Sequence, residues 1–441
     1  MNAAASIKQK LFELIEEMEK ECYLYTRNPL KDFRRVKKWS FADVMKFIIS
    51  MEGNSLKDEI LKYFNFSKET PTNSSFNQRR AQILPGAFQY LFHRFNRIIA
   101  DEKLFRGYRL IACDGSDLLY THNPQDKETH IQARSDFNGY NMLHLNVLYD
   151  LLTRRYVDAI IHPIHRGDER GAMNRMVDRF QSNSKTIFIA DKGYESFNNF
   201  AHVQEKGMYY LIRVKDIDTS CIAKSFYSKL PSEPDSFDTT FEFTLAHKKS
   251  ACPDPAKCHL IKARQRFDFL PKKNHKINRT YEMGFRIVRF QLSDKSFECI
   301  ITNLPKEEFS SDDIKELYHM RWGVETAFRE LKYAVGLTNF HSKKLGYIVQ
   351  EIWARLILYN FCEAVTTRVV MKQRDRCRKH TYQINFTRAI HICRFFLSSQ
   401  KEAPPDLEYL ISQELLPVRP GRSDRRKVKS RAAVSFLYRV A

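Results

Sequence analysis

The chain has 441 residues, of which 43% are hydrophobic and 28% charged, a composition typical of globular rather than disordered proteins. Lys and Arg total 73 against 52 Asp and Glu, which gives a formal net charge of +21 at pH 7. Such a surplus costs self-repulsion and is usually retained for a polyanionic partner. We therefore expect nucleic acid as the partner, with an anionic membrane surface as the alternative.

The cysteines and the apolar segments bear on the compartment. The nine cysteines are odd in number and form no C-x-x-C pair, which favours reduced thiols over a disulfide framework. Cys252, Cys258 and His259 lie close enough to suggest zinc, but no second ligand pair follows at the usual spacing, and we expect none there. The N-terminus has no signal-peptide pattern, and charges interrupt the most apolar segment, residues 352–371. We expect a cytoplasmic protein without a membrane span.

Residues 1–105 are predicted to form a helical DNA-binding domain. Segments 41–51, 56–64 and 75–99 carry apolar residues at helical spacing. Residues 72–83 are a candidate recognition helix, in which Arg79 and Arg80 would contact double-stranded DNA. The alternative, weighted equally, is a helical cap on the next domain with solvated basic residues.

Residues 106–215 predict a mixed α/β sheet. The short apolar runs 109–114 and 185–191 each end in an aspartate and are typical of buried strands. Segments 143–150 and 154–163, which lie between these two runs in the chain, are predicted to pair as a hairpin. Helices over 169–180 and 197–207, the second stopped by Gly207, and a last strand over 208–215 give the order β-β-β-α-β-α-β.

The remainder divides into three parts. Residues 216–303 contain clustered prolines and strand-like runs at 237–245, 283–292 and 297–304, which predict a β-rich insertion. A strong helix is predicted from Ser311 within residues 304–345. Residues 346–441 are predicted to be helical and basic, and their end, 419–431, could follow a phosphate backbone.

Two aspartates at strand ends suggest a metal site. Asp114 and Asp191 are expected at the carboxyl ends of their strands, where α/β sheets expose functional side chains. Hard divalent ions such as Mg²⁺ prefer carboxylate oxygens, and two ions about 4 Å apart can activate water and stabilise a leaving oxygen. The alternative for each aspartate is a turn residue. Asp117 is a second candidate for the first ligand, although we expect it beyond the strand's end.

The predicted helix after Ser311 supplies a third acid. At about 100° per residue, Tyr318, Arg321, Glu325 and Lys332 share an arc of roughly 60° beside a buried stripe. Glu325 is thus surrounded by two cations and a phenol, which suits phosphate binding around a metal ligand. The alternative is a simple salt bridge between Arg321 and Glu325. Trp322 lies beside the arc and could stack on an unpaired base, although burial is the commoner fate of Trp.

The spacing Tyr318-x2-Arg321-x3-Glu325-x6-Lys332 resembles the Y-(2)-R-(3)-E-(6)-K signature of the DDE transposases of the insertion-sequence-four family. ACDGS around Asp114 and IADKGY around Asp191 look like the aspartate motifs of that family. The resemblance covers residues 108–340.

The resemblance implies a ribonuclease-H-like catalytic core with a β-rich insertion between the second aspartate and the glutamate. Asp114, Asp191 and Glu325 would carry two Mg²⁺ ions, which Mn²⁺ could replace, while Tyr318, Arg321 and Lys332 would hold transposon-end DNA. The expected protein is a bacterial, nucleoid-associated insertion-sequence transposase that binds terminal inverted repeats and performs cut-and-paste cleavage and strand transfer, as a dimer on DNA. The alternatives are a non-catalytic DNA-binding protein and a metal-dependent nuclease that cuts without joining.

Overall fold

The computed structural model describes residues 3–35, 37–132, 139–217, 221–230, 235–262, 264–270, 280–293, 296–373, 382–398 and 406–417. The expected basic end of the chain, 419–431, lies outside the described residues. In the described part of the chain, no helix is long and apolar enough to cross a membrane.

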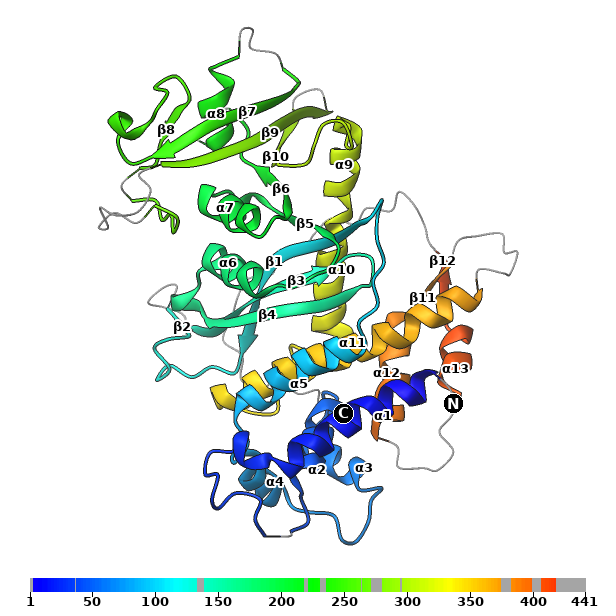
Figure 1. Cartoon of the computed structure of the whole chain (residues 1–441). Coiled ribbons are helices and arrows are strands. Elements are labelled where there is room, and N and C mark those ends of the chain that lie inside the picture. Colours follow the sequence, from blue (N-terminus) through cyan, green and yellow to red (C-terminus); the bar gives the residue numbers. More distant parts are fainter. Residues whose placement is uncertain are drawn as a thin grey trace.

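A large mixed sheet runs through the centre of the molecule (Figure 1). Its strands follow the order β2-β3-β1-β5-β6-β10-β9-β7-β8, and β4 pairs with β3. The first strands are β1 (Tyr108–Tyr120), β2 (His130–Ile131), β3 (Tyr140–Asp150), β4 (Arg155–Pro163), β5 (Lys185–Ala190) and β6 (Tyr209–Val214). β1, β5 and β6 run parallel, whereas β3 is antiparallel to both β1 and β4. The predicted α/β order and the predicted hairpin are confirmed.

The β-rich insertion continues this sheet instead of forming a separate one. Its strands are β7 (Phe237–Ala246), β8 (Cys258–Leu260), β9 (Thr280–Ser293) and β10 (Ser296–Thr302). β10 pairs antiparallel with β6, and β9 and β7 follow outward. Backbone pairing across β6 and β10 therefore ties the insertion to the strands that carry the aspartates.

Helices cover the two faces of the first half of the sheet. On one face lie α6 (Glu169–Arg179) and α7 (Phe197–Glu205), and the insertion adds the short α8 (Ile222–Tyr227). α7 ends just before Gly207, whose φ of +65° is left-handed backbone that favours glycine. Gly207 is thus the stop signal that the sequence predicts.

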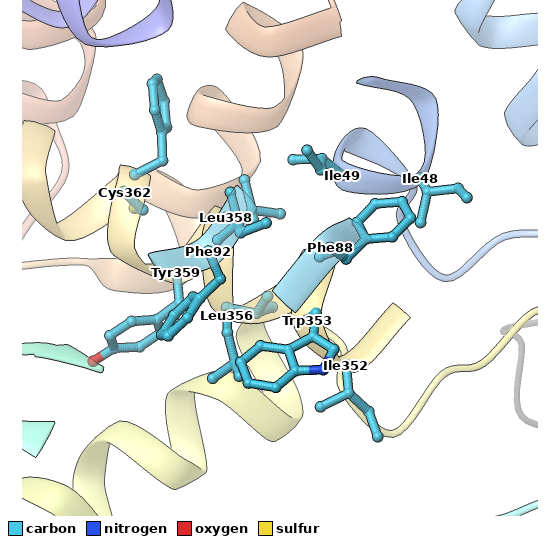
Figure 2. Close-up of a cluster of buried hydrophobic side chains, with 14 of the residues drawn as sticks. Ile48, Ile49, Phe88, Phe92, Ile352, Trp353, Leu356, Leu358, Tyr359 and Cys362 are labelled. Atoms are coloured by element: carbon cyan, nitrogen blue, oxygen red, sulfur yellow. The ribbon is translucent and has the colours of Figure 1, made fainter. Parts of the chain in front are cut away.

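The other face packs on helices from both ends of the chain. These are α1 (Ala3–Lys20), α2 (Phe41–Ser50), α3 (Leu56–Tyr63), α4 (Asn73–Arg80), α5 (Pro85–Ile98), α11 (Leu345–Gln373), α12 (Phe386–Ser398) and α13 (Leu407–Gln413). Figure 2 shows side chains of α2, α5 and α11 in one buried cluster, including Ile48, Phe88 and Trp353. The same core includes Leu145 and Val147 of β3. The two terminal helical regions therefore share one core with the sheet. β11 (Tyr382–Ile384) and β12 (Leu415–Pro417) pair in a separate two-stranded antiparallel sheet, with α12 and α13 between them along the chain.

The predicted helix after Ser311 is divided into three pieces. α9 (Ser311–Met320) begins with a capping box between Ser310 and Asp313, α10 covers Trp322–Arg329, and Glu330–Ala334 form a π-helical turn. The buried stripe is confirmed: Leu317, Val324, Phe328, Leu331 and Val335 are all buried. The expected single α-helical wheel is wrong beyond Arg329, because a π turn has a longer repeat than an α turn.

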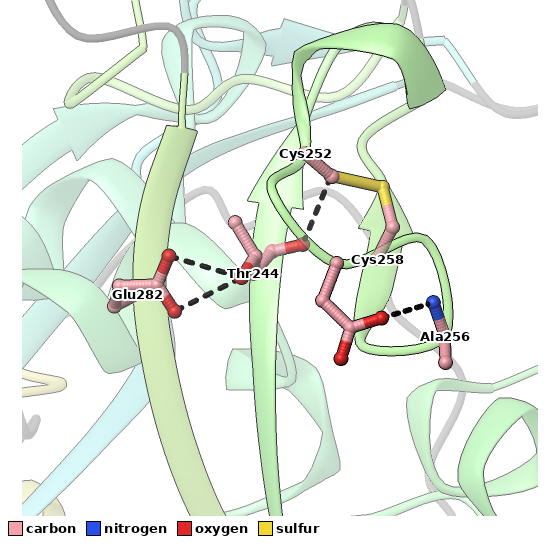
Figure 3. The surroundings of a disulfide bond; sticks show 6 residues. Thr244, Cys252, Ala256, Cys258 and Glu282 are labelled. Carbon is pink, nitrogen blue, oxygen red and sulfur yellow. Dashed lines mark hydrogen bonds between the residues drawn. A yellow bond between two sulfur atoms is a disulfide. The ribbon is translucent and has the colours of Figure 1, made fainter.

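The cysteine prediction is wrong at one pair. Cys252 and Cys258 form a disulfide, with their Cα atoms 5.8 Å apart (Figure 3). The two cysteines whose spacing suggested zinc are instead joined by a disulfide, which closes a short loop before β8. The residues of β8 pair with β7. The other six cysteines of the described residues are free.

Candidate active site

Asp114 and Asp191 lie on neighbouring parallel strands. Cys113 of β1 is paired with Ala190 of β5, so the two aspartates follow the last paired residues of their strands. Asp191 lies just beyond β5, as expected. Asp114 lies inside β1, which continues to Tyr120 because its second half pairs with β3. The expectation that Asp114 ends its strand is therefore wrong, although its position beside β5 is as the sequence indicates.

Arg321 joins the first aspartate to the glutamate. Its Nη2 donates to Glu325 Oε1 at 2.8 Å, and its Nη1 lies 3.6 Å from Asp114 Oδ2. The guanidinium is almost fully buried, with 7% of the side chain exposed. The salt bridge between Arg321 and Glu325, weighed as an alternative, is present, and the same cation also contacts an acid from β1.

Asp191 is bound by a residue that the sequence analysis did not single out. Arg213 on β6 contacts Asp191 Oδ1 at 2.7 Å and Glu298 of β10 at 3.2 Å. The Tyr318 hydroxyl donates to the same Asp191 oxygen at 3.4 Å. Because β6 pairs with β5 so that Ile212 lies opposite Ala190, Arg213 could have been found as the next residue along a predicted neighbouring strand.

Burial and mutual repulsion govern the charges of the aspartates. The pKa of Asp114 is raised to about 6: burial is the largest cause, the Gly115 N–H and Arg321 oppose it, and the charges of Glu325 and Asp191 add to it. Burial also acts to raise the pKa of Asp191, but the Lys192 N–H and Arg213 outweigh it and hold this pKa below its ordinary value. The three acids are therefore close enough to influence one another electrostatically.

The donor set suits a hard divalent cation. Asp114 of β1 and Glu325 of α10 contact the guanidinium of Arg321, which supplies the positive charge between them, and the charge of Asp191, just beyond β5, also acts on this arginine. Carboxylate oxygens of this kind are the ligands that hard divalent cations prefer. Among the described residues, however, no three His, Cys, Asp or Glu side chains are arranged to hold one metal ion. The three carboxylates are suitable ligands for a divalent metal, but in this structure their side chains contact arginines.

The other residues of the signature lie around these acids. Tyr318 is buried, with its ring 5.5 Å from the Arg321 guanidinium and 5.6 Å from that of Arg213. Lys332, in the π turn, donates from Nζ to the Asp117 carbonyl at 2.8 Å. Trp322 is 61% exposed, contrary to the commoner fate of Trp, and lines a cavity of about 580 Å³ with Arg213, Tyr318 and Arg321.

Asp117 belongs to a different cluster. Its carboxylate contacts His144 Nδ1 at 2.8 Å, and His144 Nε2 lies 3.0 Å from Glu169 at the start of α6. Burial opposes protonation of His144, but these two carboxylates raise its pKa to about 9. Asp117 lies within β1 rather than beyond it, three residues after Asp114, and so projects to the opposite face of the sheet.

Arg79 and Arg80 are not placed to bind DNA. Arg80 is fully buried and donates to Glu351 at 2.8 Å, to Gln350 at 2.9 Å and to the Tyr347 carbonyl at 2.7 Å. Arg79 is 7% exposed and donates to the Arg35 carbonyl and to Gln82. The predicted recognition helix is α4, and both arginines at its end point into the molecule, where they fix α4 against its neighbours. Their assignment as DNA contacts is corrected accordingly.

Comparison with known proteins adds independent findings. Residues 105–361, more than half of the chain, match the family described as the transposase DDE domain. The sequence is 23% identical over 231 residues to the putative transposase InsL for insertion sequence element IS186A of Escherichia coli (strain K12), a match that covers 48% of this chain and 58% of that protein. The chain thus spans little more than half the length of this relative.

Two further proteins are similar over more of the chain. The transposase for insertion sequence element IS231F of Bacillus thuringiensis subsp. israelensis is 20% identical over 405 residues, which is 81% of each protein. Among solved structures, the piggyBac transposase in its synaptic complex with hairpin DNA aligns with a TM-score of 0.46 and 10% identity, covering 94% of this chain and 84% of that one.

Proposed function

The chain belongs to the family defined by the transposase DDE domain, and we propose that it is the transposase of a bacterial insertion sequence. It would bind the terminal inverted repeats of its element as a dimer, cleave there, and join the freed ends to new DNA by a cut-and-paste route. On this proposal the sheet is a ribonuclease-H-like core, and the protein works in the bacterial cytoplasm at the nucleoid.

The observation that carries the proposal is the meeting of acids from three distant segments around the buried Arg321 and the half-buried Arg213. Asp114 and Glu325 contact one guanidinium, and Asp191 lies on the neighbouring strand. Asp114, Asp191 and Glu325 would hold two Mg²⁺ ions, or Mn²⁺ in their place. Bound ions would lower the barrier to phosphodiester cleavage by activating water and stabilising the leaving oxygen.

The cations around these acids could bind DNA once bound metal ions neutralise the carboxylates. Arg321 would then be available to a phosphate of the end DNA, and the Tyr318 hydroxyl would support it. Lys332 would reach a phosphate by exchanging its bond to the Asp117 carbonyl for one to the DNA. The exposed Trp322 ring offers a stacking surface for a base beside the same cavity.

The test uses purified protein, Mg²⁺ and duplexes taken from the inverted repeats beside its gene. Wild type is expected to nick these duplexes and to join them to a target plasmid. Glu325→Gln should keep DNA binding and lose both products by at least 100-fold, since it removes a ligand but little volume. The control is Glu307→Gln, which changes an exposed acid outside the site and should behave as wild type.

The outcomes separate the other candidate functions. Nicked products without joined ones would identify a nuclease. End binding without any metal-dependent product would identify a non-catalytic DNA-binding protein. Undiminished cleavage by Glu325→Gln would show that Glu325 is not a ligand.

A further inference from the structure

A second cavity, of about 650 Å³, opens on the face of the sheet opposite α10. Its walls come from the first turns of α6 and α7, from the start of α8, from the end of β8, and from insertion residues 261–262 and 264–267 that follow β8. α6 and α7 pack on the core that contains Cys113, whereas α10 packs on the core that contains Ala112. Because successive residues of a strand point to opposite faces, the two helix layers lie on opposite sides of β1.

Basic side chains dominate the rim of this cavity. The exposed cations that line it are Arg170, Lys215, Lys262, Arg264 and Arg266. Within the described part of the chain, an ion pair is formed by Arg266, with Asp268 at 2.8 Å, and by none of the other four. Four cations gathered at one opening, none of them ion-paired within the described residues, raise the local potential and favour a polyanion.

The two acids that line the cavity are engaged with the backbone. Glu195 accepts hydrogen bonds from the Lys215 N–H at 3.2 Å and from the Ile222 N–H at 2.7 Å. Asp168 caps α6 by accepting from the Gly171 N–H at 2.9 Å. These carboxylates shape the walls, and because only two acids line the cavity against five cations, the lining keeps a net positive charge.

The cavity lies close to the segment that carries Asp191. Arg170 Nε donates to the Gly193 carbonyl at 2.9 Å, two residues beyond Asp191. Lys215 follows Arg213, the residue that holds Asp191, by two positions on the chain. DNA that crosses the site from the Tyr318 and Lys332 side would therefore leave it toward Arg170 and Lys215.

We propose that this basic cavity binds the phosphate backbone of the DNA on the far side of the scissile phosphate from the transposon end. Before cleavage that DNA is the donor flank, and during joining it is the target duplex, which must occupy the same side of the reacting phosphate. The inference rests on the proposed function. Guanidinium groups suit the role because their fork-shaped donors match phosphate oxygens.

The test compares two probes on the triple variant Lys215→Ala/Lys262→Ala/Arg264→Ala. One probe is an end duplex that stops at the cleavage position, and the other carries 15 additional flanking base pairs. We expect the variant to bind the short probe within twofold of wild type and the flanked probe about tenfold more weakly. The logarithmic salt slope for the flanked probe should fall by about 0.9 for each lost phosphate contact.

A matched control removes the same charge elsewhere in the insertion. Lys248→Ala/Lys249→Ala/Lys257→Ala changes three exposed lysines that do not line the cavity and should leave the binding of both probes unaffected.

Equal weakening of both probes by the cavity variant, or wild-type binding of the flanked probe, would overturn the assignment. If wild type itself neither binds nor cleaves end DNA, the proposed function fails instead. If wild type cleaves end DNA but the cavity variant does not bind the flanked probe more weakly than the short one, the proposed function is retained and only this inference is wrong. Thermal unfolding of both triple variants identifies any loss of fold.

Discussion

At the scale of single residues, Asp114 is held at a cost to the stability of the fold. Burial, Glu325 and Asp191 raise its pKa to about 6, and Arg321 and the Gly115 N–H compensate only in part. An unfolded Asp has a pKa of about 3.9. The folded chain therefore binds the extra proton between about pH 4 and 6, and ionised Asp114 destabilises the fold above that range.

Asp114→Asn should raise the free energy of unfolding of the metal-free protein at pH 8 by about 1–3 kcal/mol. The gain should shrink as the pH falls through 6 toward 4, where wild-type Asp114 takes up its proton. Urea unfolding at pH 8 and pH 5 measures the difference.

Asp191→Asn provides a control with the opposite sign. The pKa of Asp191 is lowered by the Lys192 N–H and Arg213 against burial, so its ionised form stabilises the folded state. Replacement should lower stability at pH 8, and the loss should fade as the pH drops below the ordinary range of an aspartate. A pH-independent effect of Asp114→Asn, or a loss of stability at pH 8, would contradict this account.

The residues that could be found from sequence are those with a local signature. Asp114, Asp191 and Glu325 stand out because each lies next to an apolar strand or on a patterned helix. Arg80 could not be assigned correctly, because its partner Glu351 lies on α11, far away along the chain, and a basic residue at the end of a short helix reads as solvated. The Cys252–Cys258 pair was missed because spacing alone does not reveal the geometry of the loop that joins them.

At the scale of elements, the glutamate helix is fixed by a partly buried network, in which Glu363 is buried, Glu330 half-buried and Arg154 exposed. Glu330, at the start of the π turn, is contacted by Arg154 at 3.4 Å and by the Tyr359 hydroxyl at 3.0 Å. Arg154 also contacts Glu363 of α11 at 3.1 Å. The pKa of Glu363 is raised to about 7, mainly by burial. The charge of Arg154 lowers this pKa, and the charge of Glu330 raises it. The network thus ties the β3–β4 turn, the π turn and α11 together.

Arg154→Met should lower the free energy of unfolding by about 1–2 kcal/mol at pH 8, because it leaves the buried Glu363 and the half-buried Glu330 without their cation. The loss is smaller than for a fully buried ion pair, because 48% of the Arg154 side chain is exposed and solvent screens its charge. The loss should be smaller at pH 5.5, where both acids can take up protons and avoid the uncompensated charge. Thermal unfolding at the two pH values measures this, with Arg388→Met on the exposed side of α12 as control. A loss of equal size at both pH values would exclude a charge-based role for the network.

The types of the helices and strands could be predicted from the sequence, but the length of β1 and the π turn after α10 could not. Strands β1, β3, β4, β5 and β6 follow from apolar runs, and the start of α9 follows from its capping residues. The length of β1 depends on its pairing with β3, and the π turn depends on packing around Glu330. These are tertiary effects that local periodicity does not contain.

At the scale of the whole molecule, the two ends of the chain form one support for the central sheet. Helices α1–α5 and α11–α13 share a core with one face of β1 and β3 (Figures 1 and 2). The sequence predicts helices in both regions, but it could not show that they pack together, since long-range pairs such as Arg80 with Glu351 carry no local signal. This arrangement leaves the opposite face, with α6, α7 and the insertion, to present the basic cavity.

The central claim is that three acids from separate parts of this assembly share a divalent-metal site. Iron-directed cleavage of the polypeptide tests it most directly: Fe²⁺ replaces Mg²⁺ in the full chain bound to end DNA, and ascorbate with peroxide generates radicals at the metal. We expect backbone cuts near residues 114, 191 and 325, suppressed by excess Mg²⁺ and by Glu325→Gln. Cuts confined to other parts of the chain, or cuts that Glu325→Gln leaves unchanged, would contradict the account.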